Sequence, residues 1–72
     1  MTTDVTIRTR SIGLAAFLKW SGITSSGAQA KALIRDGQVK VNDDVVVTPA
    51  RQVGPGDLIT VASNSFRVKR QP

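Results

Sequence analysis

The sequence contains no cysteine and no histidine among its 72 residues. Disulfide bridges are therefore excluded, and so is a structural zinc site, which needs thiolate or imidazole ligands. The same absences remove the Ser–His and Cys–His pairs that activate nucleophiles in many enzymes. The five aspartates are left as the candidates for a catalytic carboxylate pair.

Long hydrophobic runs are also missing. The apolar stretches are only a few residues long, far short of the roughly 20 residues that span a bilayer. The start, residues 1–4, lacks the basic and then apolar layout of a secretory signal. A chain of this length has room for one hydrophobic core. We therefore expect a soluble, cytoplasmic, monomeric protein that forms a single domain over residues 1–72 and has no membrane partner.

Acidic residues are absent from two segments. Residues 5–35 contain five basic residues and no acid, and residues 58–72 contain three basic residues and no acid. Four of the five aspartates lie between them, in residues 36–57. The net charge of +5 is thus concentrated in the first half and the last stretch of the chain. A fold that brings these segments together would create a face that binds a polyanion; otherwise the charge only keeps the protein soluble.

Hydrophobic spacing predicts one strand and one helix in the first part of the chain. Residues 4–8 alternate between polar and apolar side chains, which indicates a strand. Leu14, Phe17 and the residues after them recur at helical spacing. This predicts a first helix that begins near Ser11 and ends at Gly22.

A second helix is bounded by clear signals at both ends. Ser26 and Gln29 fit a capping box at its start, and Gly37 fits a C-terminal cap. The connection between the two helices, residues 22–25, is short. The helices are therefore expected to pack against each other.

After the second helix the hydrophobic period drops to two, which predicts four short strands. In the last of them, Phe66 and Val68 are expected to face the core. The order of strand, helix pair and strands predicts an α+β fold, with two packed helices against a small twisted, mostly antiparallel sheet. The four expected strands cover residues 39–41, 45–47, 58–61 and 66–69.

The sequence gives little support to catalysis. Asp43 and Asp44 lie in a predicted hairpin turn, where both carboxylates are solvated. The glycines do not form a phosphate-binding loop, because residues 54–56 precede a strand instead of opening a helix. We expect no enzyme and no cofactor. A magnesium site, made by one or two carboxylates with substrate phosphates, stays open as an alternative.

Basic side chains on adjoining predicted elements favour nucleic-acid binding. Each of them would neutralise one phosphate, giving salt-dependent and largely sequence-independent affinity. The helix start at Ser26 and Gly27 adds exposed N–H groups and the positive end of the helix dipole. Each cation taken singly is more simply explained as an ordinary solvated side chain, but the cluster is not, because no acid interrupts residues 5–35. The candidate cations are Lys19, Lys31, Arg35 and Lys40.

Aromatic residues are few. Phe17 and Phe66 fall on apolar faces and are predicted to be core residues. Trp20 lies off the main apolar stripe and either stacks on a base or packs at the edge of the core. So few aromatics argue against an extended stacking platform for single strands, and favour folded RNA that is recognised through its shape and backbone.

Four ordered blocks of the sequence resemble the alpha-L RNA-binding domain, named for bacterial ribosomal small-subunit protein four. The resemblance covers residues 14–61, and the wording of the second block is most similar to small bacterial proteins that consist of this domain alone. It implies a helix pair and a small sheet that dock on structured RNA, usually ribosomal or transfer RNA, with the ribosomal subunit as a further partner. The blocks are residues 17–23, 26–34, 37–42 and 55–59.

The resemblance implies a set of RNA-facing residues. Lys31, Lys40 and Asn42 occupy positions expected at or near the RNA face, and Lys19 lies in the matching block of the first helix. Basic residues also stand where the family often places charge. These are Arg35 and Arg51.

The chain departs from the family pattern at two points. Many members have Arg-Leu-Asp where this chain has Gly13-Leu14-Ala15, and many have Ser-Arg where it has Ser26-Gly27. Both departures remove a cation from the usual contact surface. Arg8 and Arg10 are candidates to replace them, with Trp20 as a further contact. The remaining alternatives are a protein-interaction adaptor that uses the strand edges or the Trp20 region, and non-specific DNA binding.

Overall fold

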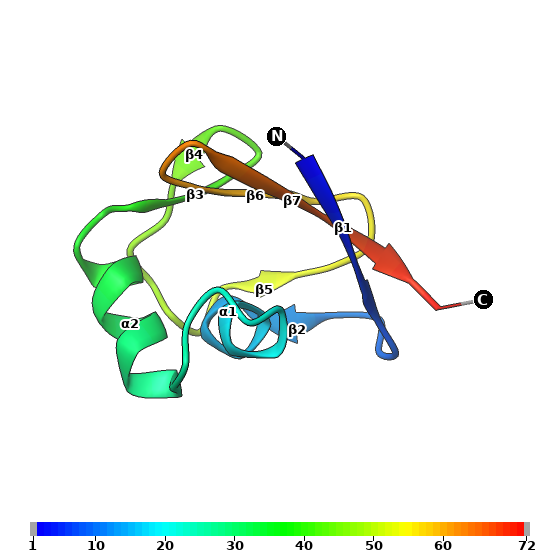
Figure 1. Ribbon diagram of the computed structural model, residues 1–72, viewed down its shortest axis with the longest axis horizontal. Helices are drawn as coiled ribbons and strands as arrows, with labels where there is room; N and C mark the ends of the chain where they lie inside the picture. The colour runs from blue at the N-terminus through cyan, green and yellow to red at the C-terminus, as the bar shows by residue number, and fades with distance from the viewer. Residues whose placement is uncertain (1, 72) are drawn as a thin grey trace.

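The computed structural model describes residues 2–71, which form seven strands and two helices. A five-stranded sheet lies over a second layer that contains both helices and a two-stranded sheet (Figure 1). The predicted α+β class is confirmed. The elements are β1 (Thr2–Ile7), β2 (Ile12–Gly13), α1 (Leu14–Trp20), α2 (Gly27–Arg35), β3 (Val39–Val41), β4 (Asp44–Val45), β5 (Gln52–Val53), β6 (Leu58–Val61) and β7 (Asn64–Arg70).

The large sheet has the strand order β1-β7-β6-β3-β4. Its pairs are antiparallel except β1 with β7, which run parallel, so the expected mostly antiparallel sheet is confirmed. The parallel pair joins the two ends of the chain, with Thr2 opposite Ser65 and Ile7 opposite Arg70. This pairing also makes both strands longer than the sequence pattern predicts.

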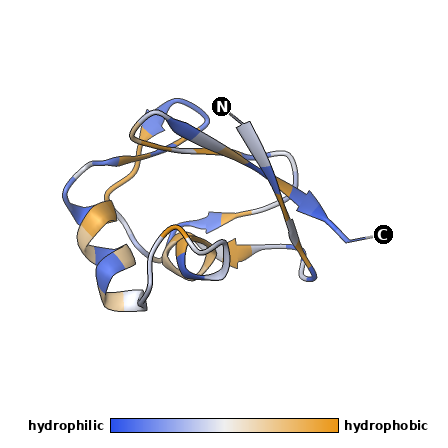
Figure 2. Ribbon diagram, viewed as in Figure 1, coloured by the Kyte–Doolittle hydropathy of each residue, from blue (hydrophilic) through white to orange (hydrophobic). Residues whose placement is uncertain are grey.

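The core lies between the large sheet and the helices. Val39 and Val41 are buried on the inner face of β3, while Phe17 on α1 and Ile34 on α2 are fully buried from the other side. In Figure 2 hydrophobic and hydrophilic residues alternate along α2, as expected for a helix with one buried side. Burial of each such side chain contributes about 1.5–3 kcal/mol. The core residues are Ile7, Leu14, Phe17, Leu18, Ala30, Ile34, Val39, Val41, Val46, Val53, Ile59 and Val68.

The start of α2 keeps half of the predicted capping box. The Oγ of Ser26 accepts a hydrogen bond from the backbone N–H of Gln29 at 3.1 Å, as predicted. The side chain of Gln29 does not return this bond to Ser26. Its Oε1 accepts from the backbone N–H of Ser25 at 2.9 Å. These two bonds therefore stabilise the position of Ser25 as well as the first turn of α2.

Both helices end in paired backbone hydrogen bonds at a glycine. The N–H of Gly37 donates to the carbonyl of Ile34 at 3.0 Å, and the N–H of Gln38 donates to the carbonyl of Leu33 at 3.2 Å. Gly37 has φ +77°, as the predicted C-terminal cap requires. Gly22, with φ +81°, follows α1 in the same manner.

The first helix begins later than predicted. The expected start near Ser11 is wrong, because Ile12 and Gly13 form β2 and pair with β5. The hydroxyl of Ser11 donates to Oε1 of Gln52 at 3.0 Å instead of capping a helix. Helix α1 starts at Leu14, whose N–H donates to the carbonyl of Arg51 at 2.8 Å.

The strand prediction for residues 45–47 is also wrong, because only Val45 belongs to β4. Val46 is buried, whereas Val45 and Val47 are each 55% exposed, since the chain leaves the sheet here and runs toward β5. The pairing of β5 with β2 was not predicted, since each strand has only two residues and carries no periodic signal. Phe66 is half-buried against the core and Val68 is fully buried, as expected.

Within residues 2–71, neither helix has the length and apolar character needed to cross a membrane.

Candidate nucleic-acid interface

Three predicted cations lie on the exposed sides of the two helices. On α2, burial of Ala30 and Ile34 fixes which side faces the core. Lys31 and Arg35, four residues apart, then share an exposed side of that helix. Lys19 is exposed near the end of α1. Two packed helices therefore present three long cationic side chains to solvent.

The N-terminus of α2 is open to an approaching ligand. Gly27 is the first helical residue, and a Cβ added there would meet no other atom within 4 Å. The Oγ of Ser26 is engaged with the N–H of Gln29, which satisfies one of the first N–H groups of the helix. The remaining N–H groups and the helix dipole make this end attractive to a phosphate oxygen.

Lys40 lies on a different surface from the helix cations. Its neighbours Val39 and Val41 are buried against the helices, so the side chain of Lys40 points to the outer face of the sheet. There it stands opposite Thr60 on β6 and Val45 on β4. The outer face of the sheet thus adds a cation at some remove from the helix layer.

Asn42 is exposed, and its side chain is held at the surface by two hydrogen bonds. Its Nδ2 donates to Oδ1 of Asp57 at 3.0 Å, and its Oδ1 accepts from the N–H of Leu58 at 3.0 Å. Asn42 also adopts φ +52°, a left-handed conformation that asparagine tolerates better than most residues. These contacts link the turn after β3 to the start of β6 and stabilise both.

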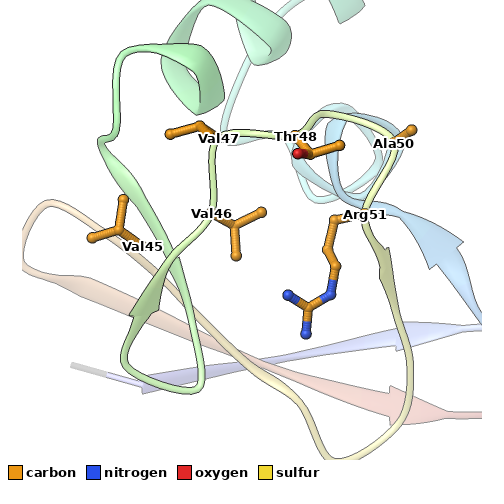
Figure 3. Close-up of a pocket in the computed structure, with 6 residues that line it drawn as sticks. All are labelled: Val45, Val46, Val47, Thr48, Ala50 and Arg51. Carbon is orange, nitrogen blue, oxygen red and sulfur yellow. The ribbon is translucent and has the colours of Figure 1, made fainter.

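Arg51 lies on the segment between β4 and β5. Figure 3 shows its side chain extending beside Val46, while Val45 and Val47 point away from it. The surface around it is a shallow hollow that also includes Thr48 and Ala50. Arg51 is therefore set among apolar side chains, and no helix cation lines this hollow.

Arg8, Arg10 and Trp20 gather near the end of β1. Both arginines are exposed in the loop that follows β1. The Nε1–H of Trp20 donates to the carbonyl of Thr6 at 3.1 Å, and the residue is 57% exposed. Packing of Trp20 at the edge of the core, one of the two roles expected for it, is thus seen only in part, because the ring is hydrogen-bonded at one edge while the residue is more than half exposed.

The structure also places the basic C-terminal strand β7 beside β1. Parallel pairing sets Lys69 opposite Thr6 and Arg70 opposite Ile7. The condition drawn from the charge distribution, that the two acid-free segments meet, is therefore fulfilled. Lys69 and Arg70 were not named as site residues, although the run of basic residues in 58–72 was the available signal.

Two of the aspartates have side-chain hydrogen bonds within turns. No group of three metal-ligating side chains occurs in residues 2–71. Asp57 accepts hydrogen bonds from Asn42 and, through Oδ2, from the N–H of Gly54 at 2.8 Å. Asp36 accepts one from the side chain of Gln38. These carboxylates hold turns together.

Two relatives match most of this chain. The protein YbcJ of Escherichia coli (strain K12) is 37% identical over 57 residues, which cover 79% of this chain and 81% of YbcJ. YbcJ of Shigella flexneri matches with the same identity and coverage.

Two solved structures share the fold. The solution structure of YbcJ from E. coli, which has an alfaL motif involved in RNA binding, matches with a TM-score of 0.67 and 32% identity, over 94% of this chain and 85% of that one. The crystal structure of the 30S ribosomal protein S4e from Thermoplasma acidophilum matches with a TM-score of 0.64 and 25% identity, over 83% of this chain. The match spans 32% of S4e.

The family model of the S4 domain matches residues 5–69, nearly the whole chain. Together with the match to YbcJ, this confirms the resemblance noted in the sequence. The chain therefore belongs to the S4 domain family, with the alpha-L fold.

Proposed function

We propose that this chain is a non-catalytic RNA-binding protein of the cytoplasm that docks on structured ribosomal or transfer RNA. The observation that carries the proposal is the match to YbcJ, whose structure has an alfaL motif involved in RNA binding and covers 94% of this chain. Ribosome assembly or translation quality control is the process that such a partner suggests.

The contact surface of this proposal is the helix pair. Lys19, Lys31 and Arg35 supply cations, and the open start of α2 at Gly27 supplies backbone N–H groups. No acid occurs in residues 5–35 to repel a phosphate backbone. Lys40 and Arg51 extend the contact from the strands where the RNA reaches around the domain. Asn42, which is exposed, fixes the turn after β3 through its hydrogen bond to Asp57.

Binding to a labelled RNA hairpin, followed by fluorescence anisotropy as a function of salt, tests the proposal. Each phosphate contact contributes close to one unit to the slope of log K against log salt. Lys31→Gln should lower the affinity for every hairpin sequence to a similar degree and reduce this slope by about one unit. Duplex DNA of the same sequence, added as competitor, separates RNA binding from non-specific DNA binding.

Ser63→Asp is the matched control for Lys31→Gln. Both substitutions lower the net charge by one, but Ser63 is exposed in the turn between β6 and β7, on the sheet. The control should change the affinity much less than Lys31→Gln. Equal losses in the two variants would mean that only the overall charge matters, and would contradict a defined face on the helices.

A second candidate function, a protein-interaction adaptor, is favoured by the surface in Figure 3. Val45 and Val47 are each 55% exposed, and β4 is an outer strand of the sheet with an unpaired edge. Exposed apolar side chains beside a free strand edge are suited to a protein partner. Such a partner would be a ribosomal protein or an RNA-modifying enzyme.

Salt separates the two candidates. RNA binding through phosphates should weaken steeply between low and moderate salt, whereas docking on valine side chains should change little. Crosslinking in cells followed by sequencing of the attached RNA would then identify the RNA. If residues 45–47 crosslink to another protein and no RNA is recovered, the adaptor function is favoured.

A further inference from the structure

Trp20 is held at one edge by a hydrogen bond and is more than half exposed. It is 57% exposed, although Phe17 on the same helix is fully buried. Its Nε1–H is already bonded to the carbonyl of Thr6 at 3.1 Å. The side chain therefore offers a ligand its flat π face, with no unsatisfied polar atom. The bond to Thr6 also holds the ring in one orientation, so that little conformational entropy is lost when a ligand stacks on it.

A hollow of about 210 Å³ lies beside this ring, and we call it the Trp20 hollow. Ile7 is buried and Ile12 half-buried, so they give the hollow an apolar side. Arg8 and Thr9 are exposed and give it a polar rim. The lining residues are Ile7, Arg8, Thr9, Ile12 and Trp20.

The charged residue that lines the Trp20 hollow is basic. Arg8 lines it, and Arg10 is exposed two residues further along the same loop. On the neighbouring strand, Arg70 stands opposite the lining residue Ile7 at the end of β7, which is hydrophilic in Figure 2. Lys69 follows the buried Val68, so it points to the outer face of the sheet. The nearest acid on β1 is Asp4, opposite Arg67 and further from the hollow. An apolar slot among cations matches a flat uncharged ring that is linked to phosphates.

We infer that the Trp20 hollow takes one unpaired nucleobase of a bound RNA, which stacks on the indole while Arg8 neutralises an adjacent phosphate. The inference rests on the proposed function and specifies which kind of structured RNA the protein prefers. Cations on the helices contact phosphates, which any duplex offers. A base stacks on Trp20 only where the RNA has a bulge, a loop or a free end. The preferred partner is therefore a duplex next to an unpaired nucleotide.

An apolar side chain of a protein partner fits this place less well. It would cover the ring and the isoleucines, but it would make no use of the positive charge of Arg8 at the rim. A nucleotide suits both features of the site, because its base can stack on the indole while its phosphate lies near Arg8.

The emission of Trp20 reports contact directly, because the chain has one tryptophan and no tyrosine. The wild-type protein is titrated with a blunt RNA duplex, with the same duplex carrying a single bulged adenosine, and with the same bulge made abasic. The bulged adenosine should quench the emission and bind about tenfold more tightly than the other two RNAs, the size expected for one stacked base. Trp20→Leu should remove this advantage without changing the affinity for the blunt duplex, and Trp20→Phe should retain part of it.

Three outcomes would overturn the inference. Equal affinity for the three RNAs, with unchanged emission, would show that no base stacks on Trp20, although the helices still bind RNA. If the protein binds none of the three RNAs, the proposed RNA-binding function is contradicted, and the inference fails with it. A change of emission with a leucine-rich peptide, but with no RNA, would assign the hollow to a protein. If Trp20→Leu does not fold by circular dichroism, the wild-type comparison of adenosine bulge with abasic bulge decides alone.

Discussion

The side-chain amide of Asn42 donates a hydrogen bond to the carboxylate of Asp57 at 3.0 Å, which ties together two turns that are fifteen residues apart in the sequence. The same carboxylate accepts from the N–H of Gly54 at 2.8 Å, and Asn42 accepts from the N–H of Leu58. This network closes the end of the sheet where β3 and β6 meet. It gives a structural role to two residues that stand in blocks resembling the family.

Substitution of Asn42 should lower stability in two separable steps. Asn42→Gly removes both side-chain bonds but tolerates φ +52°, and should lower the free energy of unfolding by about 1 kcal/mol, because the bonds are partly exposed to water. Asn42→Ala adds left-handed strain and should lower it by about 2 kcal/mol. Urea unfolding measures both. A wild-type midpoint in Asn42→Ala would show that neither the bonds nor the strain matters.

Substitution of Gly54 should destabilise the protein for a steric reason. A Cβ at this position would stand 2.9 Å from the carbonyl oxygen of Arg10, a backbone atom that cannot swing away. Gly54→Ala should lower the free energy of unfolding by about 1–3 kcal/mol, the range for overpacking. The thermal midpoint should fall accordingly. An unchanged midpoint would mean that the β2–β5 pair shifts freely to make room.

Substitution of Gly27 should act in the opposite direction on stability. Nothing lies within 4 Å of a Cβ there, and the residue is helical. Gly27→Ala should therefore raise the free energy of unfolding by about 0.5–1 kcal/mol. If a phosphate approaches the start of α2, the added methyl should also weaken RNA binding. A more stable variant with unchanged affinity for RNA would exclude this helix end from the interface.

Lys31 and Lys40 test how far the RNA contact extends. They lie on the helix layer and on the outer face of the sheet, so their effects should be independent. If both contact phosphates, Lys31→Gln and Lys40→Gln should each lower the salt slope by about one unit, and the double variant by about two. Anisotropy titrations of the same hairpin measure this. A double variant no weaker than Lys31→Gln alone would confine the RNA to the helices.

Local patterns were enough to predict much of the fold. The period of the apolar residues, the cap at Ser26 and the glycine at 37 predicted α2 correctly, because each signal acts within a few residues. The same reasoning missed β2 and β5, since a two-residue strand exists only when its partner lies alongside. It also overestimated the strand at 45–47, where two of the three valines are exposed.

The sequence by itself determined the exclusion of disulfides and zinc, the segregation of charge and the family of the chain. Tertiary structure decided which residues share a surface. Alternation along β3 set Lys40 apart from the helix cations, and parallel pairing of β1 with β7 brought Lys69 and Arg70 opposite the end of β1. The physical reason is that side-chain period is a local property, whereas strand pairing joins residues more than sixty positions apart, and only the packed core selects that partner.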